Sequence, residues 1–201
     1  MPHLHTSQGS YIYGGIGWAE LASRVYEDWY IGTPRRGVDW HFGYEWIPKR
    51  VVGMGAIYYG YAGSGSDTNY GSVAKNTLLI NYVAPQLVVR FCPNSSILGF
   101  KGSKGIFSLT GSAGLGLGME SQFIRNKDVG YSSRHTKAAL GWNVAVKGEF
   151  KIAERIRLHA MLLYVDSYIQ RPKDDPYYIK ERIIGGWNLY SISAGVTYIP
   201  K

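Results

Sequence analysis

The 201-residue sequence predicts an all-β fold, an eight-stranded antiparallel up-and-down β-barrel. Three observations predict it. Apolar residues recur at every second position, as they do in strands, and helical periodicity is nearly absent. Clusters of Gly, Pro, Asn and Asp break this alternation into eight segments. The connections between the segments are alternately long and mostly short, as expected when neighbouring strands are joined at two different ends.

The first four predicted strands lie in the N-terminal half. Residues 10–20 form the first, although glycines occupy both of its faces and make them hard to assign. Residues 39–47, DWHFGYEWI, form the second, because aromatic side chains alternate with small or polar ones. Residues 51–61 form the third and residues 77–91 the fourth. Polar residues of the fourth have odd numbers before Pro85 and even numbers after it, which predicts a β-bulge at this proline.

The other four predicted strands alternate more regularly. Residues 105–120 carry bulky apolar side chains on one face and Ser, Thr and Gly on the other. Residues 135–152 place an apolar face opposite a charged one. Residues 155–168 and 187–199 repeat this pattern with apolar residues at even positions. Each segment has the period of two that a half-buried strand requires.

The connections differ between the two predicted ends of the barrel. They are long near residues 21–39, 62–75, 121–134 and 169–185, and shorter at 47–50, about 92–104 and 151–155. Both termini then fall on the side of the shorter connections. Long surface loops at one end and short periplasmic turns at the other are typical of outer-membrane barrels. A soluble barrel has no comparable reason for this asymmetry.

Composition predicts one domain with few surface charges. No Pro/Ser-rich or charge-rich linker divides the chain, so we expect a single domain over residues 10–201. Residues 1–9 lack the apolar core of a signal peptide and are expected to be a disordered or tag-like segment before the mature chain. Charged residues make up 18% of the chain, against roughly 25% in soluble domains. No apolar run approaches the roughly 20 residues of a transmembrane helix.

The net charge of +8 raises the question of a nucleic-acid partner. The basic residues are dispersed, without a basic helix or zinc-ligand spacing, so we expect no nucleic acid. An anionic lipopolysaccharide surface would be attracted by the same charge. The histidines show no ligand spacing, and we expect no metal or other cofactor. The single Cys92 excludes an intramolecular disulfide.

The two faces of the strands can be assigned in two ways. In a soluble barrel the apolar face points inward, whereas in a membrane barrel it meets lipid. Ser, Thr and Gly opposite the apolar face of residues 105–120 suit a narrow lumen. Aromatic residues also lie near the ends of the apolar stripes, and the charges on the polar faces have both signs and can pair. These observations favour a transmembrane barrel, in which Trp142 is the least comfortably placed residue because it lies near mid-strand.

Two sets of residues follow from the membrane assignment. The first is a lumenal polar network in which buried charges are paired: Glu45, Arg90, Glu120, Lys147, Glu149, Arg157 and His159. The second is an interfacial aromatic girdle: Trp18, Trp40, Trp46, Tyr164, Tyr190 and Tyr198. An eight-stranded barrel is just wide enough to be filled by its own side chains, so we expect no open pore.

A family resemblance extends over most of the chain, through the stretches YIYGGIGW, GYEWIPKRVVGMGAIYYG, NYVAPQLVVRF, GSAGLGLGM and SISAGVTYIP. They resemble bacterial outer-membrane β-barrel domains of the OmpX/OmpA type, within the broad porin-like family of outer-membrane barrels. The end of the chain departs from the terminal aromatic residue usual in that family, because Tyr198 is followed by Ile199, Pro200 and Lys201. The resemblance implies an eight-stranded barrel in the bacterial outer membrane.

Two alternatives remain open. A lipid A-modifying enzyme would need a serine within reach of a histidine base. His135 and Glu149 share a face, but residue 137 is Lys where a resembling deacylase has Ser, and the nearest serines in sequence are Ser132 and Ser133. A soluble calycin-like barrel that binds an apolar ligand would be expected to carry a Gly-x-Trp motif in its first strand, which the stretch GIGW matches poorly.

We therefore expect a non-enzymatic, monomeric barrel of the bacterial outer membrane with a packed polar interior, four surface loops, and a structural or surface-interaction role. Its partners would be outer-membrane lipid and lipopolysaccharide. The predicted loops RVYEDWYIGTPRRG and QRPKDDPYYIKER mix aromatic residues with both charges. This composition suits contacts with a glycan, lipopolysaccharide or a protein.

Overall fold

A computed structural model describes residues 9–23, 35–49, 51–69, 72–92, 106–128, 130–168 and 186–200. They form eight strands: β1 (Gly9–Ser23), β2 (Arg36–Lys49), β3 (Val52–Asn69), β4 (Ser72–Phe91), β5 (Phe107–Asn126), β6 (Tyr131–Lys151), β7 (Ile156–Tyr168) and β8 (Trp187–Tyr198). Each of the eight predicted segments corresponds to one strand. Residues 1–8 and most of the two predicted aromatic loops lie outside the described residues.

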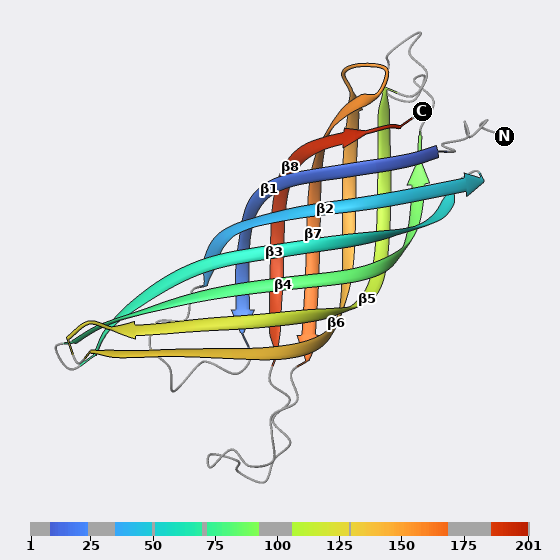
Figure 1. Cartoon of the computed structure of the whole chain (residues 1–201). Coiled ribbons are helices and arrows are strands. Elements are labelled where there is room, and N and C mark those ends of the chain that lie inside the picture. The colour runs from blue at the N-terminus through green and yellow to red at the C-terminus, as the bar shows by residue number, and fades with distance from the viewer. Residues whose placement is uncertain are drawn as a thin grey trace.

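Every strand pairs antiparallel with its neighbours in sequence, and β1 pairs with β8, so the sheet closes into a barrel (Figure 1). This confirms the predicted fold class. We call the end that carries the β2–β3, β4–β5 and β6–β7 connections the turn end, and the opposite end the loop end. Strand β1 begins and β8 finishes at the turn end (Figure 1). Within the described ranges, no helix is long and apolar enough to cross a membrane.

The apolar face of the strands points outward. Leu115 is 75% exposed, Leu87 71% and Ile16 71%, whereas Glu45, Arg90 and Glu149 are at most 1% exposed. A soluble calycin-like barrel would show the opposite arrangement. The sequence analysis favoured an apolar face that points outward and a polar or charged face that points inward, and the structure has this arrangement.

Two predicted long connections are wrong. Strands β3 and β4 continue to Asn69 and from Ser72, and β5 and β6 continue to Asn126 and from Tyr131. Residues 62–75 and 121–134 are therefore mostly paired strand. Strands β3 to β6 extend past the other four at the loop end as two long hairpins (Figure 1). The first hairpin is rich in Gly and Ser and the second in polar and charged residues. Both sequences resemble loops because the strands leave the apolar part of the barrel there, so apolar alternation stops.

The predicted β-bulge at Pro85 is also wrong. The register between β3 and β4 is constant through Ala56 and Pro85. The β4–β5 ladder has the same register on both sides of the proline but lacks its pairs between Val83 and Gln86. Pro85 has no N–H to donate, so the ladder loses a hydrogen bond without shifting. The change of polarity arises because the interior is apolar before Pro85 and polar after it.

Glycine permits one close approach inside the barrel. Gly43 and Tyr13 are cross-strand partners on β2 and β1. A Cβ atom on Gly43 would overlap the Tyr13 ring, so only glycine lets this ring lie against β2. The buried Tyr13 ring in turn contacts Lys147 and the two buried histidines. One small residue thus positions an aromatic wall of the polar interior.

Candidate functional site

Four charged side chains form an ion network in the interior near the turn end. The Lys147 ammonium lies 2.6 Å from Glu45 Oε1 and 3.1 Å from Glu149 Oε1. The Arg90 guanidinium lies 3.3 Å from Glu45 Oε2 and also pairs with Glu149. Each cation therefore contacts both carboxylates. Two positive and two negative groups cancel, which is the condition under which buried charges are tolerated.

Strand pairing places hydroxyl groups around this network. Ser108 is the cross-strand partner of Glu149, and Thr110 is the partner of both Lys147 and Arg90. Arg90 donates to Ser108 Oγ at 2.8 Å and Thr110 Oγ1 at 3.3 Å. Ser108 donates to Glu149 Oε2 at 2.9 Å. A charged group can form more hydrogen bonds than its ion pairs use. The two hydroxyls bind to remaining donors of Arg90 and to an acceptor of Glu149.

A histidine pair extends the network. His41 Nε2 lies 3.0 Å from His159 Nε2, and His159 Nδ1 lies 3.1 Å from Thr197 Oγ1. Thr197 donates to Glu149 Oε1 at 3.0 Å. The hydrogen-bonded chain therefore runs from β2 through β7 and β8 to β6. Among the described residues, no three His, Cys, Asp or Glu side chains are placed to hold a metal ion.

The seven residues predicted for the lumenal network divide into three groups. Glu45, Arg90, Lys147, Glu149 and His159 lie together. Arg157 is buried beside them and donates to Ser108 Oγ at 3.4 Å. Glu120 is buried but lies toward the loop end, where Lys137 is its cross-strand partner.

Sequence reasoning missed several members of the network. It did not select Ser108, Thr110 or Thr197, since hydroxyl residues are common on any strand, and it considered His41 only as a metal ligand, for which the histidines show no ligand spacing. The available signal was parity. All four side chains lie on the inward face of their strands, and each lies within four residues of the turn end or of Glu45.

The loop-side half of the interior is mainly apolar. Its buried residues include Leu21, Tyr59, Tyr61, Leu78, Ile80, Tyr82, Leu163, Val165, Trp187 and Leu189. Polar residues are interspersed: Asp39 accepts a hydrogen bond from Ser191, and Ser167 accepts from the Trp187 backbone N–H at 3.1 Å. Side chains close the barrel here by packing rather than by pairing charges.

The six residues predicted for the aromatic girdle all face outward. Trp18, Trp46, Tyr190 and Tyr198 are exposed, and Trp40 and Tyr164 are partly exposed. Trp142 belongs with two of them. Its ring centroid is 5.2 Å from that of Tyr164, which is 4.9 Å from that of Tyr190. The mid-strand Trp142 is thus part of an aromatic row across β6, β7 and β8.

The outward face between the two ends is free of charge among the described residues. We call this the apolar band, formed by the outward residues within 12–18, 38–46, 52–62, 79–91, 107–119, 138–150, 156–164 and 190–198. Its only amide is Asn81, whose Oδ1 accepts a hydrogen bond from Tyr58 at 2.6 Å. A polar group facing hydrocarbon needs such a partner. The band covers about 26 Å of strand on β7 and about 40 Å on β5 at roughly 3.3 Å per residue.

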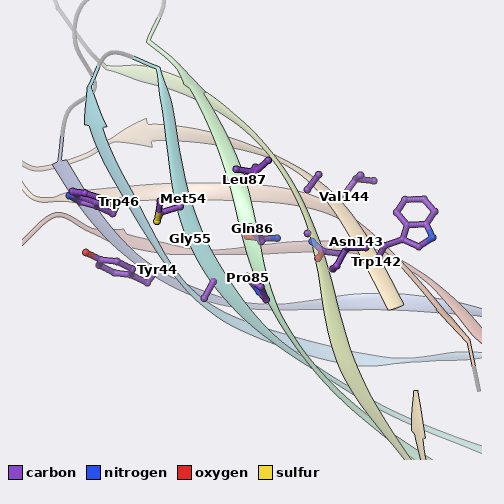
Figure 2. A pocket seen from close by; sticks show the side chains of 14 residues that line it. Tyr44, Trp46, Met54, Gly55, Pro85, Gln86, Leu87, Trp142, Asn143 and Val144 are labelled. Atoms are coloured by element: carbon purple, nitrogen blue, oxygen red, sulfur yellow. The ribbon is translucent and has the colours of Figure 1, made fainter. Parts of the chain in front are cut away.

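A groove of about 1080 Å³ indents the apolar band over β2 to β6. Tyr44 and Trp46 lie at one end and Trp142 at the other, with Pro85 and Gln86 between them (Figure 2). The small residues Ala56, Ala113 and Gly114 are also part of its lining. The lining is overwhelmingly apolar, so the groove has the chemistry to accept a hydrocarbon chain rather than a polar ligand.

The structure places His135 and Glu149, the two residues considered for a lipid A-modifying enzyme, far apart. Glu149 lies within the ion network and is 1% exposed. His135 lies on the same strand, fourteen residues toward the loop end, which corresponds to about 46 Å of strand. A base and an acid at that separation cannot act on one substrate, because a catalytic set must lie within hydrogen-bond reach.

No protein-family model matches the sequence, and no curated protein sequence matches it. Solved structures share its fold. Neisserial surface protein A is 15% identical with a TM-score of 0.54, covering 95% of this chain and 97% of that one. Ail of Yersinia pestis, in complex with the heparin analogue sucrose octasulfate, is 12% identical with a TM-score of 0.53, covering 95% and 99%. The outer membrane protein OprG of Pseudomonas aeruginosa is 11% identical with a TM-score of 0.52, covering 97% of each chain.

Proposed function

The chain has the fold of the small eight-stranded outer-membrane barrels, and we propose that it is an integral protein of the bacterial outer membrane with a structural or surface-interaction role. The observation that carries the proposal is the inverted distribution of polarity. Charges lie in paired groups inside, and the outward face is an uncharged apolar band. At a strand tilt of about 40°, the band is roughly 20 to 30 Å tall, which matches a hydrocarbon core.

The interior supports a closed barrel rather than a pore. The ion network fills the cross-section near the turn end, and packed aromatic and aliphatic residues fill it near the loop end. Barrels of eight strands leave room for little besides their own side chains. We therefore expect the reconstituted protein to show negligible conductance in planar bilayers.

The loop end supports the surface role. The β3–β4 and β5–β6 hairpins extend past the apolar band and present exposed polar and basic residues. Ail, which shares the fold, was solved with a sulfated saccharide analogue. A barrel of this fold was thus solved with a polyanion, which supports an interaction of this chain with a charged glycan or lipid.

A charge scan of the outer face tests the membrane proposal. Leu115→Arg places a charge in the middle of the band, and Ser64→Arg places one beyond its loop-side edge, at another exposed position. In a bilayer, we expect Leu115→Arg to cost about 2 to 4 kcal/mol of unfolding free energy and Ser64→Arg less than about 1. The measurement is urea unfolding in lipid vesicles, followed by the heat-dependent shift of the folded barrel on a gel.

A soluble protein would give a different result. Arginine at a water-exposed position changes stability by only about 0.5 kcal/mol, so equal stability of the two variants would contradict a membrane location. Solubility of the unmodified protein at high concentration without detergent would contradict it as well.

A further inference from the structure

The two long hairpins carry a cluster of cations on their outward side. We call this surface the hairpin face, formed by Ser64, Ser66, Lys75, Thr77, Phe123, Arg125, Ser132, Arg134 and Thr136. Lys75 is the direct cross-strand partner of Arg125. Arg134 is the partner of Phe123, one diagonal step from Arg125, and its guanidinium carbon lies 5.0 Å from the Phe123 ring centroid. Three cations on three neighbouring strands are thus held on one surface.

This arrangement is unfavourable for the protein alone. Like charges directly opposite each other in a sheet are destabilising. Lys75, Arg125 and Arg134 are all exposed, and none forms an ion pair with a carboxylate of the described residues. Among the described side chains of these four strand ends, no outward residue is Asp or Glu, and Asp128 lies in the turn at the tip. An anion bound between the cations would remove the repulsion.

The position of the hairpin face relative to the apolar band indicates which kind of anion could bind there. The band ends at Leu79, Met119 and Ala138 on β4, β5 and β6, and the three cations follow four to six residues later. At about 3.3 Å per residue and a tilt of about 40°, they lie roughly 10 to 15 Å beyond the hydrocarbon edge. If the loop end faces outward, this is the depth of phosphorylated head groups and inner sugars in the outer leaflet.

We propose that the hairpin face binds phosphate groups of lipopolysaccharide, a site that rests on the proposed outer-membrane function. Arg125 and Lys75 share one phosphate, because guanidinium groups bind it through two parallel hydrogen bonds and an ammonium adds a point charge. Arg134, held over the Phe123 ring, supplies a second guanidinium beside it. The surrounding hydroxyls of Thr77 and Ser132 provide neutral donors for phosphate or sugar oxygens.

The test measures binding of purified lipopolysaccharide to the full-length protein in detergent micelles, using the same lipopolysaccharide with its phosphates removed as a second ligand. We expect Arg125→Gln to weaken binding of the phosphorylated form about tenfold or more. Arg36→Gln is the matched control, since Arg36 is an exposed arginine at the loop end on β2, beside Ser64 but two strands from Lys75, and its cross-strand partner is Glu20. It should leave affinity nearly unchanged.

Lys75→Glu separates binding from structure. This substitution replaces a like-charge pair by an opposite-charge pair with Arg125, so the apoprotein should become slightly more stable. Its affinity for lipopolysaccharide should nevertheless fall at least as much as that of Arg125→Gln. A purely structural role for Lys75 cannot produce these two opposite changes.

Three results would overturn the proposal. Equal binding of phosphorylated and dephosphorylated lipopolysaccharide would show that phosphate is not recognised. Equal weakening by Arg36→Gln and Arg125→Gln would show attraction by net charge alone. Equal binding of phosphatidylglycerol micelles would show a general preference for phosphate lipids. Loss of the heat-dependent gel shift in the unmodified protein would instead contradict the proposed membrane barrel.

Discussion

The turn-side and loop-side halves of the barrel interior close the same cross-section with different chemistry. Near the turn end, two cations and two carboxylates contact one another and are surrounded by serine, threonine and histidine. Near the loop end, tyrosine, leucine, isoleucine and tryptophan side chains pack together. Inward side chains in both halves are largely buried. Either chemistry is stable if it is complete, so only the outer face of such a barrel has to be apolar throughout.

This difference predicts how substitutions should destabilise each half of the interior. A charge network fails when one member is removed, because its partner is left buried and unpaired. A packed apolar region fails in proportion to the volume that is lost. Three substitutions, one in each half and one at their boundary, examine this distinction.

The largest effect is expected from Arg90→Met in the turn-side half. Arg90 is fully buried, contacts both Glu45 and Glu149, and lies with its guanidinium carbon 3.8 Å from the Tyr11 ring centroid. Its removal leaves two carboxylates with Lys147 as their only cation in the network. We expect a loss of about 3 to 5 kcal/mol in the free energy of unfolding, measured by urea in lipid vesicles.

The same substitution made together with Glu149→Gln provides the control. Removing one carboxylate restores charge balance with Lys147 and Glu45, so the double variant should regain part of the lost stability. Arg90→Met is therefore measured in the unmodified protein and in the Glu149→Gln variant. If it lowers the free energy of unfolding equally in both, Arg90 acts through packing, and the two halves of the interior do not differ as described.

A smaller loss is expected from Leu189→Ala in the loop-side half. Leu189 is fully buried within the apolar cluster, so its truncation leaves a cavity. We expect the variant to be less stable by about 2 to 4 kcal/mol in the same assay. Leu115→Ala removes an equal volume from the exposed apolar band and should cost less than about 1 kcal/mol. Equal costs would indicate that the loop-side interior is loosely packed.

The smallest effect, with the opposite sign, is expected from Gln86→Leu at the boundary. Gln86 is 4% exposed, and neither its Nε2 nor its Oε1 has a hydrogen-bond partner in the structure. Replacing an unpaired buried amide by an apolar side chain should stabilise the barrel by about 1 to 2 kcal/mol. Asn81→Leu should not stabilise it, because Asn81 accepts the Tyr58 hydrogen bond. A destabilised Gln86→Leu variant would mean that this amide is hydrogen-bonded in solution.

The sequence by itself determined the eight strands and, for all but the first, the direction of their faces. A period of two repeats along each segment, and it places a charge such as Lys147 or Glu149 and an apolar residue such as Leu140 on opposite sides of one strand. The aromatic residues at stripe ends and the Ser, Thr and Gly face of β5 then indicated the inward side. These signals are local, since side-chain direction in a strand depends only on parity.

Only the tertiary structure decided which inward residues meet. Glu45 and Lys147 lie on β2 and β6, which are not neighbours, and their contact depends on the closure of the barrel and on its shear. Glu120 is separated from the other charges by its position along β5, ten residues from Thr110. Barrel closure also brings His41 beside His159. The sequence could not reveal the apolar loop-side interior for the same reason. Pro85 looked like a phase change because parity reports which side of the sheet a residue occupies and not what lies across the lumen. The two long hairpins looked like loops because apolar alternation stops where the strands leave the apolar band.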